Sequence, residues 1–193
     1  MKAVFLSASI PDPQRDPKYH RTGDVVLIRE AIDALVTFLL PRGLLVWGGH
    51  PAISPFVRRL AERMNLVDRV ETWQSEEFRR VVPQDTQALP GLIWTPRGRN
   101  KDESLTIMRA QMLSAHPFAA AVFIGGMDGV EKEYEVFTER LPGVPAFPVA
   151  STGAAARILW QRFTQADPDV QNRLAMDLIY DLLFEDVLGP LLG

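Results

Sequence analysis

The stretch from Ala119 to Phe137, AAAVFIGGMDGVEKEYEVF, constrains the fold more than any other part of the chain. It begins with a continuous apolar run over 119–124, whose length suits a strand buried on both faces. A double glycine, Gly125-Gly126, ends this run, and a third glycine follows at Gly129. A helical pattern then begins, and its apolar face consists of Val130, Tyr134 and Phe137. The stretch therefore predicts a buried strand, a glycine turn and a helix in direct succession.

Such a succession can form an anion site. Glycine lets the backbone approach a phosphate closely, and the free N–H groups of the first helical turn point at it. The candidate ligand contacts in this turn are Gly125, Gly126, Met127, Asp128 and Gly129. A turn of this kind also connects strand to helix in α/β proteins without binding anything, and the pattern alone leaves both interpretations open.

The same pattern occurs earlier in the chain. An apolar run over 44–47 ends at Gly48-Gly49, His50 follows, and Ser54-Pro55 is predicted to open a helix with serine as its cap. In a parallel sheet, both glycine turns would lie at the carboxyl ends of their strands, where ligands bind. Gly48, Gly49 and His50 are therefore candidate contacts, although a polar loop role without a ligand is the favoured alternative for His50.

The remaining segments alternate between strand and helix patterns. Further strands are expected at 4–8, 69–73, 92–95 and 144–149. Further helices are expected from Asp24 to about Leu40, at 76–82 and at 103–115, and Asp24 is the expected cap of the first. The sequence thus predicts an α/β fold, with a single domain over 1–193 built on a Rossmann-like, open, mostly parallel sheet with helices on both faces.

Two more groups of small polar residues are expected at the ligand-binding end of this sheet. Ser7 and Ser9 lie at the end of the first strand, and Ser151, Thr152 and Gly153 open a helix after the last one. All five are candidate ligand contacts. The loop over 10–23, which follows Ser9, is long enough to cover a site, and a solvated surface loop is an equal alternative.

Arg109 and Glu133 are the candidates for chemistry. Arg109 borders the apolar face of the helix at 103–115, and Glu133 borders that of the helix after the third glycine. A charged side chain beside an apolar face either extends past the edge of the core or points into a pocket. A structural ion pair and a catalytic pair are equally compatible with the pattern.

The composition narrows the function classes. The chain has 193 residues, a net charge of −3 and no cysteine, so we expect no disulfide, no thiolate metal site and no cysteine nucleophile. Lys and Arg are spread along the chain, and no nucleic-acid partner is expected. The first apolar run is too short for a signal peptide or a membrane span, so we expect a cytoplasmic protein without a membrane partner. We expect no metal and no cofactor.

The stretch at about 169–188 is predicted to be one long helix that is apolar over more than half of its circumference. Such a helix is buried either in the core or in an interface between subunits. We therefore expect a homodimer or a higher homo-oligomer that associates through apolar helices.

The run from Met108 to Glu133 resembles the SLOG superfamily, the Rossmann-like group that includes the LOG and lysine-decarboxylase-annotated proteins. LOG proteins are cytokinin-activating phosphoribohydrolases with a helix arginine, a strand, and then the motif P-G-G-x-G-T-x-x-E. Arg109 matches the helix arginine, Gly125 and Gly126 match the double glycine, and Gly129 matches the third glycine. With one residue inserted, Glu133 matches the final glutamate. Gly48-Gly49 and Ser7-Ala8-Ser9 resemble the family's other ligand-side turns.

The sequence also departs from this motif. Ile124 replaces the proline, Met127-Asp128 lengthens the turn by one residue, and Val130 replaces the threonine. The resemblance therefore favours a domain that senses a nucleotide or a nucleotide-derived ligand in a bacterial defence or signalling system. The alternative is a LOG-like phosphoribohydrolase that cleaves the N-glycosidic bond of a nucleoside 5′-monophosphate, with Arg109 and Glu133 as the catalytic pair.

Overall fold

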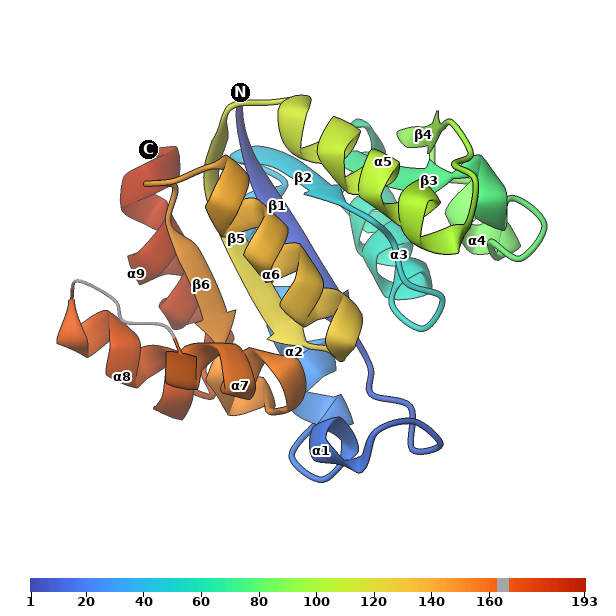
Figure 1. Cartoon of the computed structure of the whole chain (residues 1–193). Helices are drawn as coiled ribbons and strands as arrows, with labels where there is room; N and C mark the ends of the chain where they lie inside the picture. The colour runs from blue at the N-terminus through green and yellow to red at the C-terminus, as the bar shows by residue number, and fades with distance from the viewer. Residues whose placement is uncertain (163–166) are drawn as a thin grey trace.

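A computed structural model describes residues 1–162 and 167–193 of the chain. Six strands form one sheet in the order β4-β3-β2-β1-β5-β6, and all neighbouring strands pair in parallel (Figure 1). The strands are β1 (Lys2–Ser9), β2 (Gly43–Trp47), β3 (Val70–Ser75), β4 (Leu92–Thr95), β5 (Phe118–Gly125) and β6 (Ala146–Val149). The predicted α/β class, the Rossmann-like architecture and the parallel sheet are confirmed.

Helices connect these strands. The described α-helices are α1 (Pro17–His20), α2 (Val25–Leu39), α3 (Ser54–Arg63), α4 (Gln84–Gln87), α5 (Lys101–Ser114), α6 (Asp128–Arg140), α7 (Ala154–Arg162), α8 (Pro168–Met176) and α9 (Tyr180–Leu192). The described 3₁₀ turns are η1 (Val67–Arg69), η2 (Glu76–Phe78) and η3 (Ala150–Thr152). None of the helices in the described part of the chain is long and apolar enough to cross a membrane.

Two apolar layers cover the two faces of the sheet. On one face, Val4 and Leu6 of β1 pack with α2, α3 and α9. On the other face, Ala3 and Phe5 of the same strand pack with α5, α6 and α7. Phe5 stacks on Phe137 of α6, with ring centroids 5.6 Å apart. The two layers follow from the alternation of side chains along β1, which is buried on both faces.

The N-cap predicted for α2 is confirmed, and the N-cap predicted for α3 is wrong. Asp24 caps α2 as predicted, because its carboxylate accepts the N–H groups of Val26 and Leu27. Ser54 was the predicted cap of α3, but Ile53 occupies that position and makes no side-chain hydrogen bond. The Ser54 hydroxyl instead accepts the His50 N–H, at 3.3 Å, and so closes the loop before the helix.

Two other expected helices are also corrected. The helix predicted at 76–82 is only the single 3₁₀ turn η2. The helix expected to open at Ser151-Thr152-Gly153 starts at Ala154, after η3, because Gly153 has φ +74° and cannot continue a helix.

The long helix predicted at 169–188 is also wrong, because α8 and α9 are separated by an extended link over 177–179. Leu174 of α8 and Tyr180 of α9 are both buried. Six residues at about 100° each would place these two side chains about 120° apart on one straight helix. The break lets both side chains face the core.

The two ends of the chain lie close together (Figure 1). The Lys2 ammonium donates to the Leu191 carbonyl at 2.8 Å. The α9 helix, the last element of the chain, packs against α2 and β5.

Candidate functional site

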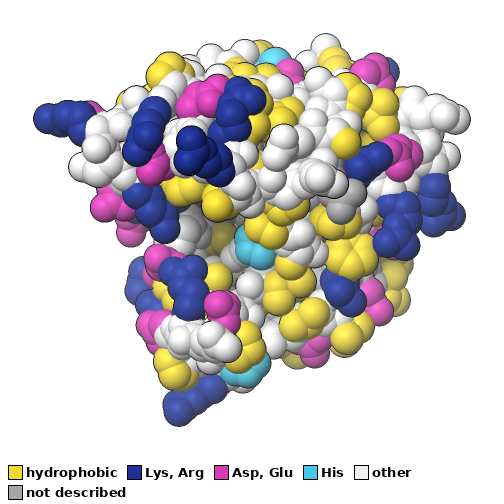
Figure 2. All heavy atoms as spheres, turned by 90° about the vertical axis from the view of Figure 1, so that its right-hand side faces the viewer, with side chains coloured by type: hydrophobic (Ala, Val, Ile, Leu, Met, Phe, Trp, Pro, Cys, Tyr) yellow, Lys and Arg dark blue, Asp and Glu magenta, His cyan; other side chains and the backbone are white. Residues whose placement is uncertain are grey.

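A cleft of about 770 Å³ opens at the carboxyl ends of β1, β2, β3 and β5. Figure 2 shows it as a hollow with hydrophobic side chains and a histidine in its wall and charged side chains around its mouth. Its volume lies within the range of small-molecule sites. The predicted location of a ligand site, where parallel strands end, coincides with this cleft.

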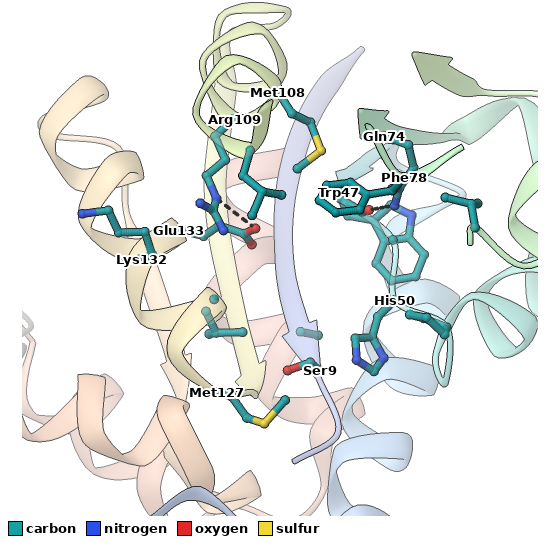
Figure 3. Close-up of a pocket in the computed structure, with 18 of the residues that line it drawn as sticks. Ser9, Trp47, His50, Gln74, Phe78, Met108, Arg109, Met127, Lys132 and Glu133 are labelled. Atoms are coloured by element: carbon teal, nitrogen blue, oxygen red, sulfur yellow. Dashed lines mark hydrogen bonds and ion pairs between the residues drawn. The ribbon is translucent and has the colours of Figure 1, made fainter. Parts of the chain in front are cut away.

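Glu133 and Arg109 meet inside the cleft (Figure 3). The Arg109 Nε lies 3.4 Å from one carboxylate oxygen of Glu133, and the Ser7 hydroxyl donates to the other oxygen at 2.6 Å. Only 11% of the Arg109 side chain and 15% of the Glu133 side chain are exposed. Ser7 is fully buried beneath them. The carboxylate is therefore held in one orientation from two sides while its edge still borders the cleft.

The turn Gly48-Gly49 forms the wall opposite Glu133. Gly49 has φ +69°, which an L side chain rarely adopts. The amide of Gln74 donates to the Gly48 carbonyl and fixes this turn on β3. A Cβ at Gly48 would lie 3.6 Å from the Met108 methyl and 4.0 Å from the Glu133 carboxylate, so this glycine leaves the backbone open to the cleft.

Trp47, Gln74, Phe78 and His50 lie together on the far side of the cleft from Glu133 (Figure 3). The indole N–H of Trp47 donates to the Thr72 hydroxyl at 2.9 Å, so this buried ring is fixed in place. Burial lowers the pKa of His50, which favours the neutral imidazole at pH 7. This wall is a mainly apolar surface with neutral polar groups.

The N-terminus of α6 forms the floor of the cleft near Ser9. Met127, Asp128 and Gly129 all line the cleft. Among the described residues, neither the Asp128 N–H nor the Gly129 N–H has a hydrogen-bond partner. The Arg15 guanidinium, from the loop after β1, pairs with the Asp128 carboxylate at 2.7 Å. Free N–H groups and a neighbouring guanidinium together favour a negatively charged ligand group.

Gly125 and Gly126, by contrast, do not line the cleft and are buried. The Gly125 N–H donates to the Thr152 hydroxyl at 2.9 Å, and the Gly126 N–H donates to the Ser9 carbonyl at 2.8 Å. These two N–H groups are thus used inside the fold. The double glycine sets the path of the chain between β5 and α6.

The turn at 151–153 also lies outside the cleft lining. Thr152 is fully buried, and its hydroxyl also donates to the Val149 carbonyl. The Ser151 hydroxyl lies 3.2 Å from that of Tyr180, and a Cβ on Gly153 would collide with the Thr22 carbonyl at 1.8 Å. These three residues join α7 to its neighbours.

The structure therefore brings together a subset of the predicted site residues. The cleft is lined by Ser9, Gly48, Gly49, His50, Arg109, Met127, Asp128, Gly129 and Glu133. Ser7 acts from below, through Glu133. The sequence interpretation missed Trp47, Gln74 and Phe78, of which Gln74 and Phe78 lie at the end of β3 and just beyond it. The position of Gln74 and Phe78 at the end of a strand and just beyond it was the available signal, but neither lies next to a glycine turn.

Metal ligation finds no support in the described residues, since no three His, Cys, Asp or Glu side chains there are grouped to hold an ion. The cleft combines the oriented carboxylate of Glu133 and its partner Arg109 with an ion pair between Arg15 and Asp128 and with an apolar wall. These groups can bind an organic anion, and the carboxylate can accept a proton or stabilise a positive charge.

The fold and the cleft define an open, parallel α/β protein with a candidate site at the carboxyl ends of its strands. The model of the SLOG cluster3 family matches residues 18–188 of the chain. The chain therefore belongs to the SLOG cluster3 family, and the predicted superfamily is confirmed.

A solved structure supports the fold. The X-ray structure of TM1055, a structural genomics target, superposes with a TM-score of 0.60 and 16% sequence identity. The match covers 96% of this chain and 99% of TM1055. At this identity the likeness shows the shared fold alone. The search of curated proteins found no match.

Proposed function

We propose that the cleft binds a nucleotide or a nucleotide-derived ligand, and that the chain acts as a sensor domain of a bacterial defence or signalling system. One observation carries this proposal. The cleft combines an apolar, partly aromatic wall with a helix N-terminus whose first N–H groups have no partner among the described residues. A nucleotide needs both surfaces, because its base is planar and apolar and its phosphate is an anion. Membership of the SLOG cluster3 family supports the same ligand class.

In this proposal the two ends of the ligand bind at different places. The base lies against Phe78 and Met108, and the neutral His50 offers a hydrogen bond without adding charge. The phosphate lies at the start of α6, beside Arg15. Gly48 leaves room for the sugar between these ends, opposite Glu133.

The Asp128 carboxylate opposes the binding of a phosphate at this site. It carries a negative charge at the same helix end and pairs with Arg15 in the ligand-free protein. A phosphate that binds there must take over the Arg15 guanidinium, or Asp128 repels it. We therefore expect Asp128→Asn to bind nucleotides more tightly than the wild type does.

A thermal-shift screen tests the binding proposal. The probes are nucleoside monophosphates, ADP-ribose derivatives and NAD, each at millimolar concentration, and mass spectrometry monitors the products. A rise in melting temperature without product is expected for the wild type and for Glu133→Ala. Glu135→Ala is the matched control, because Glu135 lies on the exposed face of the same helix. If none of the probes raises the melting temperature, the proposal is wrong.

A second candidate function rests on the orientation of Glu133. Ser7 and Arg109 hold its carboxylate at the cleft surface. Cleavage of an N-glycosidic bond builds positive charge on the ribose, which such a carboxylate stabilises, or it activates the attacking water. Release of free base from a nucleoside 5′-monophosphate by the wild type and by Glu135→Ala, but not by Glu133→Ala, would establish this phosphoribohydrolase activity. A broad nucleotide panel without product would exclude it.

Three broader expectations belong with these proposals. We propose that residues 1–193 work as one domain, supported by the contact between Lys2 and Leu191. A cytoplasmic location stays a prediction. The homo-oligomer also stays a prediction, and light scattering would measure it. Much of the apolar face of α9 is buried in the core of the same chain. The α9 side chains buried there are Tyr180, Leu183, Phe184, Val187 and Leu188.

A further inference from the structure

An apolar surface lies where α8 ends and α9 begins. Its residues are far along the chain from those of the cleft. Four large hydrophobic side chains are more than half exposed within seven consecutive residues. They are Met176 at 68%, Leu178 at 56%, Ile179 at 65% and Leu182 at 52%. Single exposed hydrophobic residues are common on protein surfaces, but several within one short segment favour an interaction site. We call these four residues the 176–182 patch.

The patch is held in place by the fold. Arg173 in the last turns of α8 donates to Asp177 at 2.8 Å and to Asp186 of α9 at 2.6 Å. The hydrogen bonds that Arg173 donates to both carboxylates raise its pKa. Tyr180, in the middle of the patch sequence, is buried and anchors α9. The link over 177–179 is therefore fixed at both ends, and its two apolar side chains point outward.

The charges around the patch are mainly acidic, with Arg173 as the one basic residue that the described contacts place beside it. From residue 176 to the last residue the chain has four acidic residues, Asp177, Asp181, Glu185 and Asp186, and no Lys or Arg, which gives a charge of −4. Arg173 engages Asp177 and Asp186. Asp181 and Glu185 are exposed and flank Leu182 on the outer face of α9. Among the described residues, neither has a basic partner.

We propose that the 176–182 patch is the docking surface for a basic amphipathic helix of a partner protein. The apolar face of the partner helix covers Leu178, Ile179 and Leu182, and the Lys or Arg residues of that helix pair with Asp181 and Glu185. The acidic flank selects this occupant. A two-fold contact between copies of this chain would bring Asp181 and Glu185 close to their own counterparts, and an anionic lipid surface would repel them.

A peptide-binding measurement tests this proposal. The probe is a labelled helical peptide of Leu and Lys with leucines spaced three and four residues apart, and its counterpart has Glu in place of every Lys. Fluorescence anisotropy with the full-length protein measures both. We expect saturable binding of the Lys peptide, and we expect the Glu peptide to bind at least about tenfold more weakly.

Variants locate the binding surface. We expect Asp181→Lys with Glu185→Lys, and separately Ile179→Ser with Leu182→Ser, each to raise the Kd of the Lys peptide by about tenfold or more. The controls are Glu139→Lys, an exposed acid on α6, and Val81→Ser, an exposed hydrophobic residue at the cleft, and they leave the Kd unchanged. All these side chains are exposed, so we expect the variants to fold.

Three results would overturn the proposal. One is no binding of the Lys peptide up to about 1 mM. Another is equal binding of the Lys peptide by the patch variants and the controls. The third is a wild-type dimer in light scattering that dissociates in the Ile179→Ser, Leu182→Ser variant, because the patch would then be the contact between two copies.

Discussion

The two double-glycine turns follow β2 and β5, the two strands that flank β1 in the sheet. In sequence they are nearly equivalent, since each ends an apolar run and precedes a helix. In the structure, Gly48 and Gly49 line the cleft, while Gly125 and Gly126 are buried and have their N–H groups paired. The comparison teaches that a glycine turn becomes a candidate binding surface only where the rest of the fold leaves its backbone uncovered.

The largest effect is expected from an alanine in the buried turn. Gly126 has φ +93°, and a Cβ there would lie 2.4 Å from a methyl group of Val130. Backbone strain and overpacking together should lower the free energy of unfolding by about 3 kcal/mol. Urea denaturation of Gly126→Ala measures this loss. Gly48→Ala is the control, with an expected loss of less than about 1 kcal/mol, because its Cβ makes only ordinary contacts. Equal losses at both positions would contradict the comparison.

Thr152 provides a sharper test of the pairing within the buried turn. Its hydroxyl accepts the Gly125 N–H and donates to the Val149 carbonyl. Thr152→Val keeps the shape but leaves both backbone groups without their partner, so we expect a loss of about 2 kcal/mol in urea denaturation. Ser151→Ala, next to it, should cost less than about 1 kcal/mol, because its one contact is only partly buried. A larger loss for Ser151→Ala would show that the turn is held differently.

The two serines of β1 extend the comparison to the cleft. Ser7 is buried and donates to Glu133, whereas Ser9 lines the cleft. A hydrogen bond to a charged group is worth about 1.5–3 kcal/mol, so Ser7→Ala should lower the free energy of unfolding by about 1–2 kcal/mol, and Ser9→Ala by less. Chemical denaturation without ligand measures both. If Ser9→Ala is the more destabilising change, Ser7 does not position Glu133.

The smallest effect concerns His50, beside the open turn. Burial lowers its pKa below the ordinary 6.5, so the folded protein binds this proton less readily than the unfolded chain does. The stability is therefore full above pH 6.5 and falls as the pH drops from 6.5 through the lower folded-state pKa. We expect the wild type to lose more stability than His50→Gln between about pH 7.5 and about pH 5.5, as measured by urea denaturation. A larger loss in the variant would mean that His50 is not held neutral.

Hydrophobic patterns in the sequence were sufficient for the parallel sheet, the positions of most strands and the helix capped by Asp24. They succeed because burial of alternate or every third to fourth side chain is a local property of the chain. The same patterns failed at 169–188. The helix is broken there, because Leu174 and Tyr180 could not both face the core from one straight helix. The direction of the core depends on how distant elements pack.

The candidate site was determined by the sequence only in part. The helical positions of Arg109 and Glu133 placed both beside apolar faces. The tertiary structure brings the two side chains together and places the Ser7 hydroxyl against Glu133. Which glycine turn stays open was decided by the tertiary structure alone, because the hydroxyl that takes the Gly125 N–H comes from Thr152, 27 residues away. A turn sequence specifies its own backbone shape, but the partner of each N–H group is set by the packing of the whole chain.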